Sequence, residues 1–251
     1  MKKAILCAAA LTFGATSFAQ FNQNDSEITQ NGDENQAFVS QVGISEDYSM
    51  VDQRGEEGLA IVNQTGWYQD SEITQRGQEQ KAVVNQSGFG QDSYIVQKGE
   101  NPGAHDPVNN EAYVAQSGFD HYSTIDQNGS DNVASVAQTD RQNDSDINQD
   151  GSDNHTAVNQ SDRWNDSFVT QQGHENNANV NQSGWDNYSD IMQHGHANMA
   201  NVAQSGGWND SNIDQRGAEN SANVSQSGFG DLSNIDQHGH MNAATVSQSS
   251  F

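Results

Sequence analysis

Apolar residues recur at every second position in short runs along this chain, and the runs recur with a fixed period. The clearest copy alternates from Ser211 to Gln215, has a glycine at Gly217, and alternates again from Asn220 to Gln226. Alternation that uses β-branched residues is typical of strands with one buried face. Glycine between two such runs predicts a turn, because it tolerates positive φ. Each copy therefore predicts a strand, a turn, a second strand and a second turn.

The full pattern is S-x-I-x-Q-x-G-x-x-N-x-A-x-V-x-Q. Its ten copies open at Ser26, Ser49, Ser71, Ser93, Ser123, Ser145, Ser167, Ser189, Ser211 and Ser233. Most copies are 22 residues apart, and an eight-residue insertion after Gly99 lengthens one spacing to 30. Both prolines lie in this insertion, as expected of residues that cannot donate to a strand ladder. The period predicts an all-β fold, a β-solenoid of ten strand-turn-strand repeats that is cross-β when assembled.

The recurring positions are expected to face the inside of the solenoid, because none of them holds a charged residue in any copy. Stacked coils would place Ile on Ile, Val on Val and Gln on Gln, about 4.7–4.8 Å apart, with amide ladders along the axis. The predicted core ladder consists of Ile28, Gln30, Val39, Gln41, Ile73, Gln75, Val84, Gln86, Ile95, Gln97, Val114, Gln116, Ile125, Gln127, Val136, Gln138, Ile147, Gln149, Val158, Gln160, Val169, Gln171, Val180, Gln182, Ile191, Gln193, Val202, Gln204, Ile213, Gln215, Val224, Gln226, Ile235, Gln237, Val246 and Gln248. The predicted turn glycines are Gly32, Gly55, Gly77, Gly99, Gly129, Gly151, Gly173, Gly195, Gly217 and Gly239.

The N-terminus has a different character. Two lysines precede an apolar run, and Ser17 and Ala19 supply the small residues that a signal peptidase needs, which predicts a secretory signal peptide over residues 1–19. Residues 20–25 then form a short N-terminal segment, and residues 26–251 hold the ten repeats. No apolar run is long enough to cross a bilayer as a helix, so we expect no membrane insertion. Cys7, the only cysteine, lies in the predicted signal, which leaves the exported chain without a disulfide.

Charge and composition narrow the function. The chain has 34 acidic and 9 basic residues, a formal net charge of −25, which excludes simple binding to nucleic-acid phosphates. We expect the acids to lie on outer faces and in turns, where they keep monomers soluble and apart. The sequence has no Gly-rich phosphate loop, basic patch or catalytic set, so we predict no enzyme activity and no cofactor.

Energetics favour self-association. The single Ile and Val of one copy cannot offset the conformational entropy lost on ordering its 22 residues, so a coil is stable only within a stack. The repeats begin close to the predicted cleavage site and end close to Phe251, so we expect uncapped ends. Open strand edges recruit further chains, and a head-to-tail contact that does not close gives a fibre.

The recurring motif, which contains Q-x-G-x-x-N-x-A-x-V-x-Q and spans residues 26–248, resembles the curlin repeat of bacterial curli fibres. The resemblance implies a secreted subunit of a functional amyloid fibre, used for biofilm matrix and adhesion on the surface of a bacterium with an outer membrane. It also implies export through an outer-membrane secretion pore, nucleation by a minor subunit, and the remains of a secretion signal in residues 20–25. Regular copies up to the C-terminus favour the major subunit, with the nucleator as the alternative.

Some copies depart from the motif. Gly58 stands at the Asn position of the motif, Thr156 at its Ala position, and Val51 and Val169 at its Ile position. The second copy is therefore the weakest match. These departures put the kinetics of assembly in doubt rather than the architecture.

Three sets of side chains leave further chemistry open. His174, His196 and His240 follow turn glycines and are weak candidates for Zn or Cu ligands, although turns accept any polar residue. A row of aspartates precedes the opening serine, and it could slow assembly by repulsion, bind Ca²⁺ weakly or simply be solvated. This row consists of Asp25, Asp70, Asp92, Asp144, Asp166 and Asp210.

Aromatic residues cluster in the second turn, where they could stack on one another or bind carbohydrate. They are Trp67, Phe89, Phe119, Trp164, Trp185, Trp208 and Phe229. Two other function classes remain open. A monomeric solenoid that binds ice or polysaccharide would need a flat array of threonines and capped ends. A β-helix enzyme would need a long polar loop, for which only residues 100–109 qualify.

Overall fold

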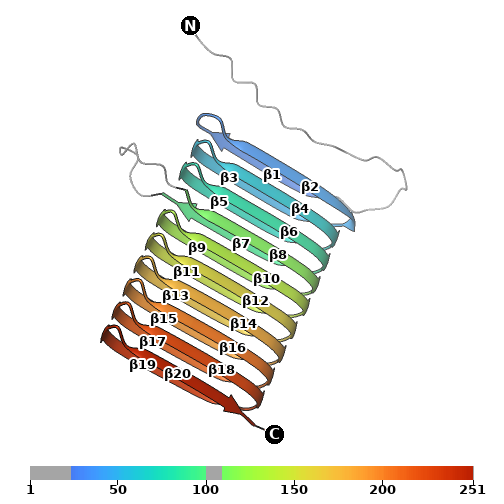
Figure 1. The fold of residues 1–251 in the computed structure, drawn as a ribbon. Helices are drawn as coiled ribbons and strands as arrows, with labels where there is room; N and C mark the ends of the chain where they lie inside the picture. Colours follow the sequence, from blue (N-terminus) through green and yellow to red (C-terminus); the bar gives the residue numbers. More distant parts are fainter. Residues whose placement is uncertain (1–23, 100–108, 251) are drawn as a thin grey trace.

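The computed structural model describes residues 24–99 and 109–250, and it confirms the predicted all-β solenoid of ten coils (Figure 1). The predicted signal peptide, residues 20–23 and the insertion up to residue 108 lie outside the described residues. Each coil contributes one strand to each of two parallel ten-stranded sheets.

The strands alternate between the two sheets along the chain. The first sheet is ordered β1 (Asp25–Asn31), β3 (Tyr48–Glu56), β5 (Asp70–Gln78), β7 (Asp92–Lys98), β9 (Tyr122–Ser130), β11 (Asp144–Ser152), β13 (Asp166–His174), β15 (Tyr188–His196), β17 (Asp210–Ala218) and β19 (Leu232–His240). The second sheet is ordered β2 (Gln36–Ser45), β4 (Leu59–Trp67), β6 (Lys81–Phe89), β8 (Glu111–Phe119), β10 (Val133–Arg141), β12 (His155–Arg163), β14 (Asn177–Trp185), β16 (Met199–Gly207), β18 (Ser221–Phe229) and β20 (Ala243–Ser249).

Strands pair in the register of the repeat, so equivalent residues of neighbouring coils lie side by side. Ile191 pairs with Ile213, and Gln193 pairs with Gln215. The register also holds across the insertion, where Ile95 of β7 pairs with Ile125 of β9. The longer spacing after Gly99 therefore leaves the stack unchanged.

The hydrophobic core lies between the two sheets and runs the length of the stack. Its Ile, Val and Ala rows are at most 5% exposed from Val51 to Ile235. Residues of the end coils, such as Ile28 and Val246, pack against this core but are only partly buried. The side chains between these rows point outward, as the alternating burial of the strands shows.

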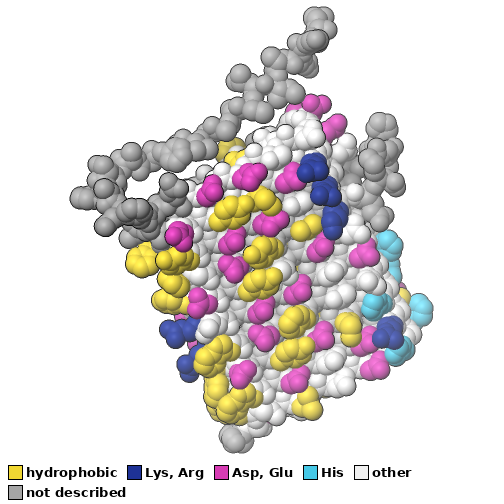
Figure 2. All heavy atoms as spheres, turned by 180° about the vertical axis from the view of Figure 1, so that it is seen from behind, with side chains coloured by type: hydrophobic (Ala, Val, Ile, Leu, Met, Phe, Trp, Pro, Cys, Tyr) yellow, Lys and Arg dark blue, Asp and Glu magenta, His cyan; other side chains and the backbone are white. Residues whose placement is uncertain are grey.

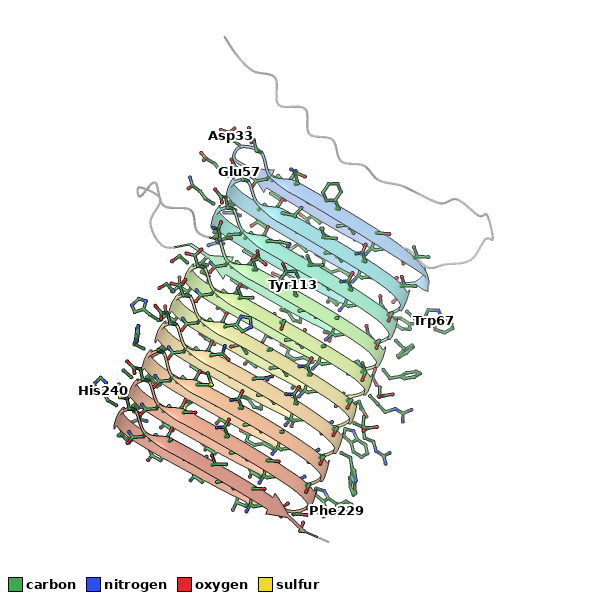
Figure 3. All side chains as sticks on the ribbon, in the orientation of Figure 1. Asp33, Glu57, Trp67, Tyr113, Phe229 and His240 are labelled. Atoms are coloured by element: carbon green, nitrogen blue, oxygen red, sulfur yellow. The ribbon has the colours of Figure 1, made fainter. Side chains whose placement is uncertain are left out.

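The two halves of each coil follow one plan with an offset of eleven residues. Ser211 corresponds to Ala222, and Gly206 of the second turn corresponds to Gly217 of the first. The second turn thus has a glycine row of its own, which the sixteen-residue motif did not include. The turns nonetheless differ in their outer side chains: Asp33, Glu57 and His240 lie at one edge of the solenoid, and Trp67 and Phe229 at the other (Figure 3).

Gly195 provides a test of the turn geometry. Its φ of +124° is unfavourable for any other residue, and an added Cβ would lie 1.9 Å from the carbonyl oxygen of Gly217 in the next coil. We expect Gly195→Ala to lower the free energy of unfolding by about 3 kcal/mol or more. The measurement is a urea unfolding curve of the soluble chain.

Gly230 supplies the matched control, because its φ of +72° lies in the left-handed region and no heavy atom lies within 4 Å of an added Cβ. Gly230→Ala should cost only about 1 kcal/mol. Equal losses for the two variants would contradict the close coil-to-coil approach at Gly195.

Candidate functional site

Two glutamine ladders run along the stacking axis, one on the inner face of each sheet. In the first ladder, nine consecutive Nε2–H···Oε1 bonds of 2.7–2.9 Å link Gln30 to Gln237 through every coil. In the second, nine bonds of 2.9–3.0 Å link Gln41 to Gln248. Every donor belongs to the earlier coil and every acceptor to the later one, so both ladders have the same polarity.

Each glutamine amide also holds the two sheets together. Gln193 Nε2 donates to Gln215 Oε1 at 2.9 Å and to the carbonyl oxygen of Asn177, in the opposite sheet, at 3.0 Å. Its Oε1 accepts from Gln171 Nε2 at 2.9 Å. The buried amide is therefore bonded in both directions along the axis and across the core, which offsets the cost of removing it from water.

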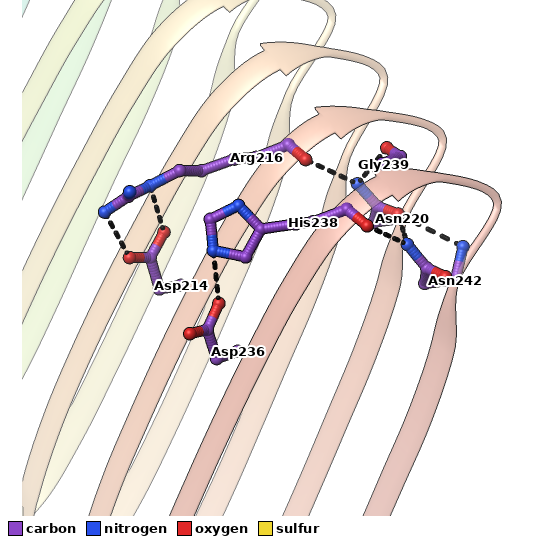
Figure 4. Close-up of polar contacts among 7 residues, drawn as sticks. All are labelled: Asp214, Arg216, Asn220, Asp236, His238, Gly239 and Asn242. Carbon is purple, nitrogen blue, oxygen red and sulfur yellow. Dashed lines mark hydrogen bonds and ion pairs between the residues drawn. The ribbon is translucent and has the colours of Figure 1, made fainter.

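Asparagines form a further ladder at the first corner of the coil. Asn220 Nδ2 donates to the carbonyl oxygen of Gly239 at 3.0 Å, and Asn220 Oδ1 accepts from Asn242 Nδ2 at 2.9 Å (Figure 4). The backbone N–H of Asn242 donates to the same Oδ1 at 3.1 Å. Each asparagine thus fixes the corner of the next coil.

A second asparagine row at the other corner was missed by the sequence analysis. Asn165 is buried, donates to Asn143 Oδ1 at 3.1 Å, and donates to the carbonyl oxygens of Ser161 and Gly184. The signal was present in the sequence, since Gln-x-Gly-x-x-Asn occurs in both halves of the seventh and eighth copies. The interior therefore contains one more polar row than the motif predicted.

Asp47 occupies this second corner row in the second coil, so an acid that was expected to be solvated in a turn is buried instead. It is 1% exposed. Its Oδ1 accepts from the backbone N–H of Gln69 at 3.2 Å, whereas Oδ2 has no partner among the described residues. Burial raises the pKa of Asp47. The carboxyl stands where an asparagine would donate, which explains the orphaned oxygen.

The opening serines line the core without using their hydroxyl groups. Within residues 24–99 and 109–250, the buried Oγ has no partner in nine of the ten: Ser26, Ser49, Ser71, Ser93, Ser145, Ser167, Ser189, Ser211 and Ser233. The second sheet has alanine at the equivalent position in nearly every coil. The hydroxyl row therefore fills space and adds no bonds to the stack.

The aspartate row predicted before the opening serine lies at the start of the first-sheet strands. Asp70 is in register with Asp92, and Asp144 with Asp166, whereas tyrosines such as Tyr188 interrupt the row. Burial, and next the Asp166 carboxylate, raise the pKa of Asp144 to about 6. Burial also raises the pKa values of Asp70, Asp92 and Asp166. Charging this row at neutral pH therefore costs free energy.

The candidate metal ligands do not converge. His174 and His196 are in register on β13 and β15, but Ala218 separates His196 from His240. His174 Nδ1 lies 2.6 Å from Ser152 Oγ, and His196 Nε2 lies 3.7 Å from a Glu175 carboxylate oxygen. In the described ranges no three His, Cys, Asp or Glu side chains group as metal ligands.

The aromatic side chains of the second turn form contacts along one edge of the solenoid. Trp67 and Phe89 have ring centroids 6.4 Å apart, as do Phe89 and Phe119. Trp185 and Trp208 are 4.3 Å apart. Arginines continue the edge in the fifth and sixth coils, between these two groups. The contacts favour mutual stacking as one role of these aromatic residues.

A shallow depression lies on the outer face of the second sheet. Its lining includes Ala137, Thr139, Asn159 and Ser183, and no titratable group. Among the described residues, no helix has the length and apolar character needed to cross a membrane.

Comparison with known proteins agrees with this geometry. The sequence profile described as "Curlin associated repeat" matches residues 108–139 and 217–249. These two segments are similar to curlin associated repeats. Each matched segment spans three consecutive strands, β8 to β10 and β18 to β20, and the same inner positions recur in the other coils. No curated protein matches the chain. Curlin repeats and this solenoid are features of a structural subunit rather than of an enzyme.

Gln193 and Ser189, which lie on the same strand, test the ladder. Gln193→Leu keeps the bulk but leaves the buried amides of Gln171 and Gln215 each without one partner. We expect the free energy of unfolding to fall by about 3 kcal/mol, measured by urea unfolding of the soluble chain.

Ser189→Ala is the matched control, since it removes a hydroxyl that has no partner and introduces the residue used by the second sheet. It should change stability by less than about 0.5 kcal/mol or increase it. A Gln193→Leu chain as stable as the Ser189→Ala chain would refute the ladder.

The aspartate row predicts a pH dependence. The pKa of Asp144 is about 6 in the folded chain against an ordinary value of 3.8, so the folded state binds more protons between these values. Stability should therefore rise as pH falls from about 7 to 4, and fibres should grow faster. Asp144→Asn should flatten this rise, measured by urea unfolding at each pH.

Asp153→Asn is the control, because it removes the same charge from an exposed turn. In the Asp153→Asn chain, the free energy of unfolding should change with pH as it does in the unchanged chain. If Asp144→Asn left the pH dependence of the free energy of unfolding unaltered, the aspartate row would not govern that dependence.

Proposed function

We propose that this chain is the major structural subunit of an extracellular amyloid fibre, in which solenoids stack head to tail. The polarity of the glutamine ladders carries the proposal. At the first coil, Gln30 and Gln41 present Oε1 atoms that no donor in the described residues satisfies. At the last coil, Gln237 and Gln248 present amide N–H groups whose described acceptors are carbonyl oxygens of the same solenoid. One end therefore offers acceptors and the other donors.

The end strands support the same contact. Their inward residues are only partly buried, whereas the same rows are fully buried in the inner coils. A second chain placed on either end would cover the rows of Ile28 and Val246 and extend both sheets by backbone hydrogen bonds. Two complementary ends repeat without closing, which is the geometry of a fibre.

The regularity of the stack favours a main subunit over a nucleator. Both glutamine ladders pass through all ten coils, including the second, where Gly58 replaces the corner asparagine. Export by the predicted signal peptide, passage through an outer-membrane secretion pore, nucleation by a minor subunit, and a role in biofilm matrix and adhesion belong to the same proposal. They rest on the curlin family.

The decisive experiment is dilution of the chain from denaturant, followed by electron microscopy and fibre diffraction. We expect unbranched fibres with a reflection at about 4.7–4.8 Å. Ile213→Asp places a charge in the core and should abolish growth. Asn212→Asp adds the same charge to the outer face of the same strand and should leave fibres intact. Fibres from the Ile213→Asp chain, or a soluble native chain that never assembles, would overturn the proposal.

A further inference from the structure

The two outer faces of the solenoid differ sharply in charge. Strands of the first sheet hold sixteen Asp and Glu against four Lys and Arg, whereas strands of the second sheet hold three of each. Figure 2 shows the acidic side chains spread over the face of the first sheet, together with a short column of Lys and Arg. One face is therefore strongly anionic and the other has no net charge.

The charges of the second sheet are also compensated locally. Lys81 and Glu111 are adjacent in register, and both contact Tyr113, which donates to the Glu111 carboxylate and lies under the Lys81 ammonium. Asp162 Oδ2 accepts from the backbone N–H of Gly184 at 2.9 Å. Arg141 and Arg163 are adjacent in register, and each directly follows an aspartate, so the formal charge of these two strands is balanced as well.

The second sheet carries an apolar stripe on this face. Phe38, Ile61, Val83 and Tyr113 lie in register on β2, β4, β6 and β8, and Phe38 is 48% exposed. Beyond the stripe, the same column continues as Ser135, Ala157, Asn179, Asn201, Asn223 and Thr245. Small polar residues next to an apolar stripe give a surface that another sheet can approach closely.

We propose that the outer face of the second sheet is a lateral interface that packs against the same face of a second stack of this chain. This proposal rests on the proposed function, because it concerns how finished columns associate. First-sheet faces cannot meet in this way, since the sixteen acids of each face would be brought together with only four Lys and Arg to compensate them. The neutral face is the one on which two columns can meet without charge repulsion.

The symmetry follows from the stripe. A two-fold axis parallel to the stacking direction sets each coil opposite the same coil of its partner, so the four coils that carry Phe38 to Tyr113 lie opposite the same four coils. An antiparallel pair would set the stripe against the polar coils. Ten strands of nine residues present about 1,300 Å² per molecule, above the roughly 800 Å² per partner of a stable interface.

The test measures mass per length of fibres by scanning transmission electron microscopy. The unchanged chain should give twice the value of a single column. Asn181→Glu with Asn223→Glu places acids on the second-sheet face in the seventh and ninth coils, and it should halve the value. The matched control, Thr170→Glu with Asn212→Glu, adds the same charge to the first-sheet face of the same coils and should keep the doubled value.

Chemical crosslinking tests the lateral interface without the charged variants. Asn181→Cys lies at the centre of β14, and Cys7→Ser leaves it as the only thiol. A bismaleimide that spans roughly 10 Å, the separation of packed sheets, should join chains of two columns. Equivalent residues within one column are about 48 Å apart and cannot react. Thr170→Cys should give no dimers.

The outcomes separate the two proposals. Native fibres with the mass of a single column, or dimers from Thr170→Cys but not from Asn181→Cys, would overturn the lateral interface and leave the fibre itself standing. Absence of fibres from the native chain would overturn the proposed function instead.

Discussion

The amide-to-amide hydrogen bond between stacked glutamines is the interaction on which the structure depends. Each coil buries one Ile and one Val, which is too little to offset the conformational entropy lost on ordering 22 residues. Hydrogen bonds between neighbouring coils must therefore add to the stability that comes from packing the two sheets together. Gln193 does both, because its one amide bonds to the coils before and after it and to the opposite sheet. Since every link is the same, adding a coil repeats the same gain, and stability accumulates with length.

The same interaction explains why polar residues fill most of the interior. A buried amide costs free energy unless each donor and acceptor is satisfied, and only strict stacking of identical residues satisfies all of them. The amide rows therefore fix the register between neighbouring coils more strictly than apolar rows alone could. A shifted Ile still makes apolar contacts, whereas a shifted Gln loses its hydrogen bonds. Asp47 shows the cost of a mismatch: its carboxyl cannot donate, and one oxygen is left without a partner.

Much of the fold could be predicted from the sequence, because ten copies of the motif show which positions recur without any comparison between proteins. The number of coils, the strand-turn-strand plan and the all-β solenoid followed from the spacing of Ser, Ile, Gln and Gly. The second corner row was missed because Asn165 lies outside the sixteen-residue motif, although the eleven-residue offset within each coil repeats the first corner. The burial of Asp47 could not be foreseen, since a single acid between two strands is expected to be a solvated turn residue.

Charge divides the solenoid into surfaces with separate tasks. Along the axis, the inner rows that reach the ends are uncharged, so the proposed head-to-tail contact avoids much of the repulsion expected from a net charge of −25. Across the axis, the acids are concentrated on one sheet, where the raised pKa of Asp144 records their mutual repulsion and partial burial. If the charge were spread evenly over both sheets, no face would be free for lateral contact. Confining it to one sheet leaves the ends and the second-sheet face free of net charge for the two contacts proposed above.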